Sequence, residues 1–282
     1  MVYQKIKFII MKKNNLYCVL FVLLIMSLMS CRKEREDRNK TLDNKMTVDN
    51  GTSENLFNDL FKVVDDVSDN TAGIKDLEIT CIDTIIVDTS ASPRTVLIDF
   101  GQDDCAGADG KIRKGQIQVT YTGRYREQGT IITITPISYT INGYSINGTK
   151  TITNLGANSS GQTHFSISVN GTVTAPGNVW SATWYATRTR TWIEGEGTMQ
   201  RTDDVYQISG GGGGVNRNGV SYTVSITTPL RIELDCPYIV SGVVAIQPAE
   251  NDLRIVNFGS GTCDNAFSVT VNGETFELGT EG

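Results

Sequence analysis

The hydrophobic residues between Glu54 and Val67 recur at the spacing of one face of an α-helix, with polar residues between them: Leu56, Phe57, Leu60, Phe61, Val63, Val64 and Val67. Repeats at three and four residues predict an amphipathic helix. Ser53 is a suitable N-cap residue. We therefore expect one helix over residues 54–70, docked on a sheet by its apolar face in preference to a partner protein, because an exposed apolar stripe is costly in water.

From residue 77 onward, hydrophobic and polar residues alternate, which predicts β-strands. Asn-Gly pairs, which suit the tight type I′ turn, occur at Asn142-Gly143, Asn147-Gly148, Asn170-Gly171, Asn218-Gly219 and Asn272-Gly273. The glycines at 210–214 predict a further break or a flexible loop. Because no helical crossovers separate the strands, they should pair antiparallel. The pattern predicts an all-β fold for residues 77–282, an extended antiparallel β-meander or sandwich with one short N-terminal amphipathic helix.

The N-terminus has a different pattern. Four lysines precede an apolar run of 14 residues, 16–29, which is too short for a membrane span of about 20 residues and predicts a signal peptide over residues 1–30. The run ends in Leu28-Met29-Ser30-Cys31, which resembles the lipobox of bacterial lipoproteins. This resemblance implies cleavage before Cys31, lipid on that cysteine and attachment to a membrane. An uncleaved helix, or an ordinary signal peptide with Cys31 uninvolved, is the alternative.

Residues 31–53 are rich in charges and poor in hydrophobic residues, so we expect a flexible tether behind the lipidated cysteine. Cleavage removes four of the 25 Lys and Arg residues and none of the 31 Asp and Glu residues, which takes the formal net charge from −6 to −10. Nucleic acids require basic surfaces to neutralise their phosphates. The charge therefore argues against a nucleic-acid partner.

Four cysteines remain in the β region, and two of them end the same motif, Phe-Gly-x-x-x-Cys, at Cys105 and Cys263. Each follows a strand–turn–strand pattern that begins near another cysteine, Cys81 or Cys236. Four cysteines allow three pairings, and we favour Cys81 with Cys105 and Cys236 with Cys263, each closing one hairpin. Export would permit such disulfides. The spacing disfavours a zinc site.

All three tryptophans lie in one segment, residues 180–192. In a strand, Trp180, Trp184, Arg188, Arg190 and Trp192 would share one face. An exposed face of this kind would suit a glycan, with rings stacking on sugars and guanidinium groups binding hydroxyls or carboxylates. The alternative, which we favour, is a buried face in which arginine and aromatic side chains pack together. The opposite face carries Ser181, Thr183, Tyr185, Thr187, Thr189 and Thr191, and its threonine row resembles those of ice-binding arrays.

Two further sites have weaker support. Asp103, Asp104 and Asp109 lie on a glycine-containing loop and offer oxygen ligands for Ca²⁺, although an ordinary Asp-Gly turn explains them as well. No other cofactor is indicated. His164 is the single histidine and lies on an expected strand, without the sharp strand–helix turn that presents a catalytic serine.

The segments YTGRYREQGTIITI, INGTKTITN, TRTRTWI and VSGVV, together with the lipobox and the Phe-Gly-x-x-x-Cys motifs, resemble uncharacterised all-β lipoproteins of Bacteroidetes. The resemblance implies an outer-membrane lipoprotein, with surface exposure left open, and it implies no activity. We expect a membrane-anchored, non-enzymatic binding or structural module of the cell envelope, whose partner is a glycan or an envelope protein. A hydrolase that uses His164 or Asp109 is the minority alternative.

Overall fold

A computed structural model describes residues 45–71, 79–198, 200, 202–236 and 238–278. All of them belong to one compact unit, Asn44–Gly282. The expected signal peptide at 1–30, the lipidation site Cys31 and the tether up to residue 44 lie outside the described residues.

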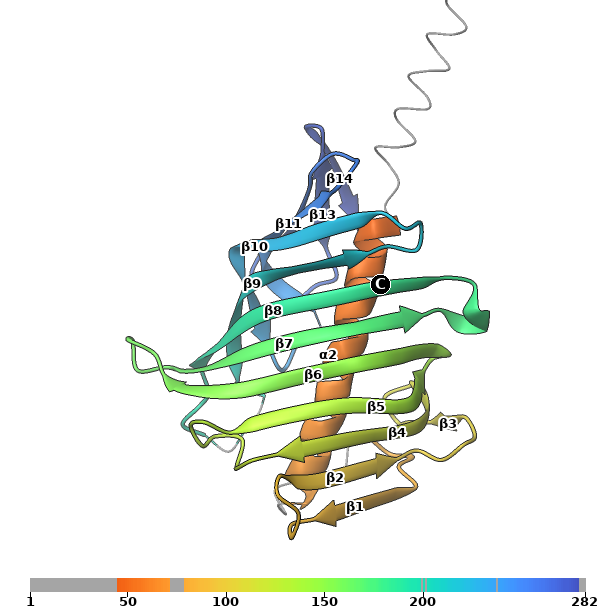
Figure 1. Cartoon of the computed structure of the whole chain (residues 1–282). Coiled ribbons are helices and arrows are strands. Elements are labelled where there is room, and N and C mark those ends of the chain that lie inside the picture. Colours follow the sequence, from red (N-terminus) through yellow and green to blue (C-terminus); the bar gives the residue numbers. More distant parts are fainter. Residues whose placement is uncertain (1–44, 72–78, 199, 201, 237, 279–282) are drawn as a thin grey trace, which may run out of the picture. The chain divides into compact units, whose positions relative to one another are not determined.

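One antiparallel sheet of 14 strands makes up most of the unit (Figure 1). Neighbouring strands follow one another along the chain, with the order β1-β2-β4-β5-β6-β7-β8-β9-β10-β11-β12-β13-β14 and the short β3 paired to β4. Their bounds are β1 Thr84–Asp88, β2 Arg94–Asp99, β3 Cys105–Ala106, β4 Ile112–Tyr121, β5 Ile131–Ile141, β6 Tyr144–Ala157, β7 Thr163–Thr174, β8 Ser181–Glu194, β9 Val205–Val215, β10 Ser221–Glu233, β11 Ile239–Pro248, β12 Arg254–Ser260, β13 Phe267–Val271 and β14 Glu274–Leu278. The expected antiparallel meander is confirmed.

Helix α2 (Lys45–Thr71) runs across the strands on one face of the sheet, which we call the inner face (Figure 1). Its hydrophobic residues Phe57, Leu60 and Val63 are fully buried and belong to the core. The amphipathic helix therefore docks on the sheet, as the hydrophobic spacing predicts. No helix in the described part of the chain is long and apolar enough to span a membrane.

The helix begins at Lys45, so two expectations about its start are wrong. The tether does not extend to residue 53, and Ser53 is not the N-cap but a buried residue inside the helix. The sequence pattern misses the first turns of the helix because most of their buried residues are polar. Two of these side chains form hydrogen bonds with the sheet and with the turn between β9 and β10. Asp49 bonds with Arg217, and Asn50 accepts a hydrogen bond from the indole of Trp184. A buried helix face made of hydrogen-bonded polar residues has no hydrophobic periodicity in the sequence.

The glycines at 210–214 form the middle of strand β9, and the expected break or flexible loop there is wrong. All five pair in register with β8, and Gly211 to Gly214 also pair with β10 on the other side. A Cβ atom on Gly212 would overlap the carbonyl oxygen of Tyr185, and one on Gly214 would overlap that of Thr183. The glycines therefore let three strands approach more closely than side chains would allow.

Both favoured disulfides are present, Cys81–Cys105 and Cys236–Cys263, with Cα atoms 5.8 Å apart in each. They join the open ends of two hairpins, β1–β2 and β11–β12. On a chain-entropy estimate each contributes about 3–4 kcal/mol by restricting the unfolded chain.

The repeated Phe-Gly motif also has the same local structure in both hairpins. The side chain of Asp99 accepts a hydrogen bond from the backbone N–H of Gly101 at 2.8 Å, and that of Asn257 accepts one from Gly259 at 3.0 Å. Both glycines have φ near +80°, which favours glycine because it has no Cβ. The sequence repeat thus corresponds to a structural repeat.

Candidate functional site: the two faces of the sheet

Strand β8 directs its tryptophans and arginines toward helix α2. Trp184 and Trp192 are each only 3% exposed. The indole of Trp184 stacks on Phe57 at 5.5 Å between ring centroids and donates to Asn50 at 3.0 Å, while the indole of Trp192 donates to Asp204. Because both tryptophans are buried, an exposed glycan platform formed by them is wrong, and the buried alternative is confirmed for these residues.

The arginines of the same face hold the helix against the sheet. The guanidinium carbon of Arg190 lies 4.8 Å from the ring centroid of Phe61 on α2. It also lies 4.9 Å from the ring centroids of Phe165 and Tyr206. Arg188 faces the carboxylate of Glu54 at 3.7 Å. Both arginines are buried. Cation–π contacts of this kind contribute up to about 2 kcal/mol once water is excluded.

Lys150 on β6 is buried under the same helix. Its ammonium group donates to the backbone carbonyl of Phe57 and to the side chain of Asn58, both at 3.0 Å. Burial lowers the pKa of Lys150 to about 7, and the nearby charge of Arg190 lowers it further, while Glu54 opposes the shift. This lysine is therefore the group in the interface whose charge changes near neutral pH.

A second charged cluster joins the helix to strand β4. Arg113 is buried and donates to the carboxylate of Asp59 on α2 at 3.1 and 3.2 Å, and to Asp109 at 2.6 and 2.9 Å. The hydrogen bonds from Arg113 lower the pKa of Asp109. Lys111 also pairs with Asp59. Asp109 thus has a structural partner, which accounts for its position without a metal.

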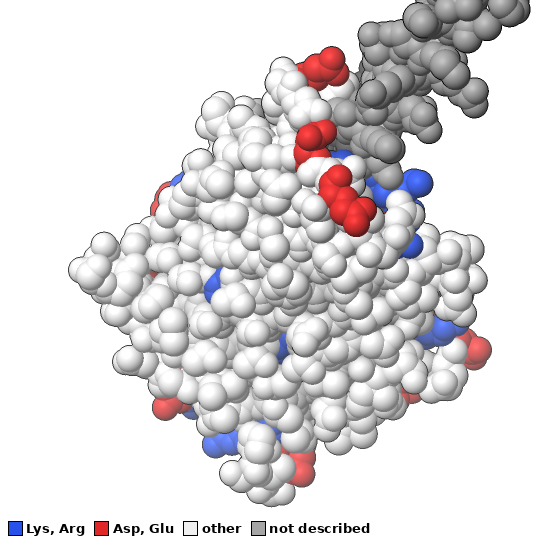
Figure 2. Space-filling view, turned by 45° about the horizontal axis from the view of Figure 1, so that its top comes forward, with Lys and Arg blue, Asp and Glu red and all other residues white. Residues whose placement is uncertain are grey.

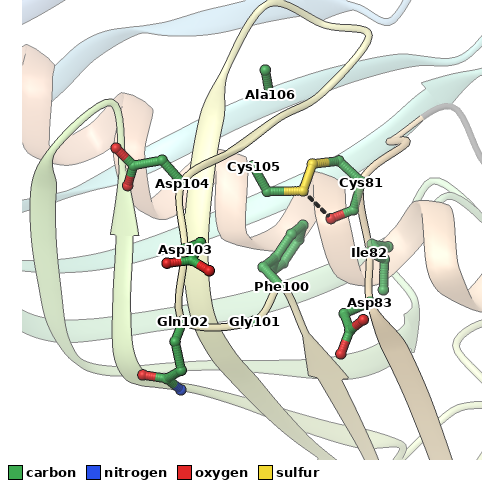
Figure 3. A pocket seen from close by; sticks show the side chains of 10 residues that line it. All are labelled: Cys81, Ile82, Asp83, Phe100, Gly101, Gln102, Asp103, Asp104, Cys105 and Ala106. Atoms are coloured by element: carbon green, nitrogen blue, oxygen red, sulfur yellow. Dashed lines mark hydrogen bonds between the residues drawn. A yellow bond between two sulfur atoms is a disulfide. The ribbon is translucent and has the colours of Figure 1, made fainter.

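The other two aspartates of the proposed calcium loop lie apart from Asp109. They line an open pocket of about 650 Å³ beside the first disulfide (Figure 3). Its lining residues are Cys81, Ile82, Asp83, Phe100, Gly101, Gln102, Asp103, Asp104, Cys105 and Ala106. Asp104 pairs with Lys114 at 3.0 Å. Within the described residues, no three carboxylate, histidine or cysteine side chains are grouped as metal ligands, and the Ca²⁺ site stays a prediction.

His164 lies on β7, partly exposed, with its Nδ1 atom 2.8 Å from the carbonyl oxygen of Gly156. Because a carbonyl oxygen only accepts, Nδ1 carries the proton in this contact. Thr191 is its register partner on β8. The hydrolase alternative remains a prediction that these contacts do not test.

The face of the sheet turned away from the helix, which we call the outer face, has a different composition. On β6, β7 and β8, five consecutive rows of outward side chains pair across the three strands: Ser145–Thr174–Ser181, Asn147–Thr172–Thr183, Thr149–Asn170–Tyr185, Thr151–Ser168–Thr187 and Thr153–Ser166–Thr189. None of these 15 residues is buried, and none is charged. We call this set the hydroxyl array. Figure 2 shows this side of the unit as a broad field with few charged side chains.

The hydroxyl array continues onto neighbouring strands. Thr151 pairs with Thr133 on β5, which pairs with Thr120 on β4. Strands lie about 4.8 Å apart, and alternate residues along a strand lie about 6.6–6.8 Å apart, so the array presents donors and acceptors at a regular two-dimensional spacing. Tyr185 stands in the middle row of the array, on β8, and is 47% exposed.

Sequence reasoning found the threonine row of β8 but missed the array. Alternating Ser, Thr and Asn residues in residues 145–153 and 166–174 carry the same signal as those in β8. What the sequence lacks is the register, since a shift of one residue between strands would send each row to the opposite face.

Trp180 differs from the other two tryptophans because it lies at the end of the sheet and is only partly buried. The guanidinium carbon of Arg217 lies 4.1 Å from its ring centroid, and Tyr144 packs edge-on at 6.0 Å. It packs against the core as a partly buried residue and is not part of the hydroxyl array.

Comparison of the chain with models of known protein families, with curated proteins and with solved structures found no match.

Proposed function

We propose that this protein is a lipid-anchored, non-enzymatic binding module of the bacterial cell envelope, and that the hydroxyl array binds an uncharged polysaccharide. The observation that carries the proposal is the composition of the array, 15 outward side chains in register that can all donate or accept hydrogen bonds and that carry no charge. The lipid anchor rests on residues 28–31. The two disulfides support export, because disulfides persist in oxidising compartments.

An uncharged polysaccharide matches the array in three respects. Ser and Thr hydroxyls donate and accept hydrogen bonds, as sugar hydroxyls do. A soluble protein surface usually carries charges on about 25–35% of its residues, so a face without any is poorly suited to an ionic partner. The exposed ring of Tyr185 offers a flat apolar surface for the C–H face of one sugar ring.

A polymer also compensates for weak individual contacts. Each hydrogen bond exchanged with water contributes only about 0.5–1.5 kcal/mol. A chain molecule that spans several rows gains from many such contacts at once, because the first contact raises the effective concentration of the next. We therefore expect measurable affinity for long polysaccharides and little for their monosaccharides.

The first test is binding of the full-length mature protein to gels that contain dextran, amylopectin or xylan, compared with the anionic polymer alginate. We expect retardation by at least one neutral polymer and its loss in Tyr185→Ala. Tyr238→Ala, an exposed tyrosine outside the array, is the control and should bind as the parent does. Binding to alginate alone, or equal retardation of both variants, would refute the proposal.

A second candidate function, assembly with another protein, is favoured by edge strand β1. Its residues Ile86 and Val87 are exposed, and no strand in the described part of the chain pairs with its outer edge. Strand β14, at the other edge, carries two glutamates that discourage pairing. Crosslinking of intact cells should then recover a partner from the parent and not from Ile86→Lys, whereas an unchanged pattern would count against this candidate.

A further inference from the structure

The most exposed large hydrophobic residue in the described part of the chain is Val179, which is 76% exposed in the turn between β7 and β8. Trp180 follows it and is only partly buried. Val48, in the first turns of α2, is 52% exposed. None of these residues belongs to the hydroxyl array, and their exposure has no role in the proposed polysaccharide binding.

Contacts with Arg217 join Trp180 to the first turns of helix α2. Its guanidinium group covers the ring of Trp180 at 4.1 Å, and its Nε atom donates to the carboxylate of Asp49 at 2.7 Å. The backbone N–H of Arg217 donates to the other oxygen of that carboxylate at 2.9 Å. Val48 is the neighbour of Asp49 on the helix. We call the set Val48, Val179, Trp180 and Arg217 the helix-start rim.

The composition of the rim fits the boundary between a bilayer and water. Tryptophan prefers this boundary because it has a large apolar ring and one polar N–H group, and valine favours the apolar side. The charge of Arg217 is already balanced by Asp49, so the contact should not require anionic lipids.

The position of the rim along the chain favours the membrane as its binding partner. Helix α2 begins at Lys45, and the segment between Cys31 and Lys45 reaches at most ~50 Å when fully extended. The helix start is therefore the described point that is nearest, along the chain, to the lipidated cysteine of the proposed function.

We propose that the helix-start rim rests on the headgroup layer of the membrane that holds the Cys31 lipid, with Val179 and Trp180 inserted into the interface. The inference rests on the proposed lipid anchor. It adds a second contact to that anchor.

The three tryptophans provide the test, because Trp184 and Trp192 are buried in the core and only Trp180 is accessible at the rim. The lipidated full-length mature protein is reconstituted in phosphatidylcholine vesicles whose lipids carry bromine close to the headgroup. Brominated lipid should quench part of the emission of the parent, relative to vesicles without bromine. Trp180→Phe should lose this quenching, and Trp192→Phe should retain it.

A second variant keeps the test independent of changes at the tryptophan itself. Val179→Asp alters an exposed side chain, so the circular dichroism spectrum should not change, and the quenching should fall. Vesicle-bound protein whose quenching is absent, or is the same in Trp180→Phe, would overturn the rim contact while leaving the anchor intact. If the parent fails to float with the vesicles, the anchor itself is refuted, and the rim proposal with it.

Discussion

The carboxylate of Asp49 in helix α2 accepts hydrogen bonds from both the backbone N–H and the guanidinium group of Arg217, 168 positions away in the turn between β9 and β10. Asp49 is fully buried. This pair joins the beginning of the helix to the sheet and shows why a segment that resembles a charged tether is part of the fold.

Asp49→Ala should lower the free energy of unfolding by about 2 kcal/mol, because the buried carboxylate accepts charge-assisted hydrogen bonds from Arg217, which itself stays partly exposed. Urea denaturation followed by circular dichroism measures the change. Asp83→Ala, in which the replaced side chain is exposed, should shift the free energy by less than about 0.5 kcal/mol. Equal effects of the two substitutions would show that the Asp49–Arg217 contact does not hold the helix start.

Gly51→Ala tests whether the helix includes residues before Glu54. A Cβ atom at this position meets no other atom within 4 Å, and the residue lies inside α2. Alanine should therefore raise the free energy of unfolding by up to about 1 kcal/mol, since glycine is the poorer helix former. No gain in stability, measured by the same urea titration, would indicate that residue 51 belongs to a flexible tether.

The stability of the protein should increase as the pH rises above about 7. The pKa of Lys150 is about 7 in the folded protein, and about 10.4 is usual for an unfolded chain. Between these two values the unfolded state binds more protons than the folded state, so raising the pH favours folding. Below about pH 7 both states are protonated and the full cost of burying the charge is present.

The measurement is the urea midpoint at pH 7, 8 and 9 for the parent and for Lys150→Met, which has similar length and no charge. The parent should gain stability across this range, and the variant should show a smaller gain. Parallel pH profiles would refute the assignment. The raised pKa values of the buried tyrosines Tyr125, Tyr139 and Tyr222 act in the opposite direction, but only near pH 10 and above.

The strands, their antiparallel pairing and both disulfides follow from patterns that are local in sequence. Alternation of hydrophobic residues identifies a strand without knowledge of its neighbours. The motif Phe-Gly-x-x-x-Cys places Cys105 and Cys263 after their hairpins in the same way.

The remaining features depend on contacts between distant residues. Gly212 suggests a break in the strand when the sequence is considered alone. Its pairing with Ala186 on β8 and Val224 on β10 shows that it lies within the sheet. The first turns of α2 look hydrophilic because Asn50 is satisfied by Trp184, which lies far along the chain. The hydroxyl array requires the register of three strands. Sequence periodicity shows which residues share a face of one strand. It does not show which residues of neighbouring strands pair with them.

The most direct test of the central claim, that the hydroxyl array binds a neutral polysaccharide, is to introduce charge into the array and measure affinity. The double variant Thr151→Glu and Thr187→Glu places carboxylates on both sides of Ser168, where each would lose hydration on binding. Affinity electrophoresis in the neutral polysaccharide that retards the parent should show a dissociation constant raised by at least about tenfold, a loss of about 1.4 kcal/mol.

Thr227→Glu, at an exposed position of β10 outside the array, serves as the matched control and should leave the dissociation constant unchanged. Circular dichroism of each protein confirms that the fold is retained. If the double variant remains folded and binds as tightly as the parent, or if Thr227→Glu weakens binding to the same extent, then the array is not the binding surface.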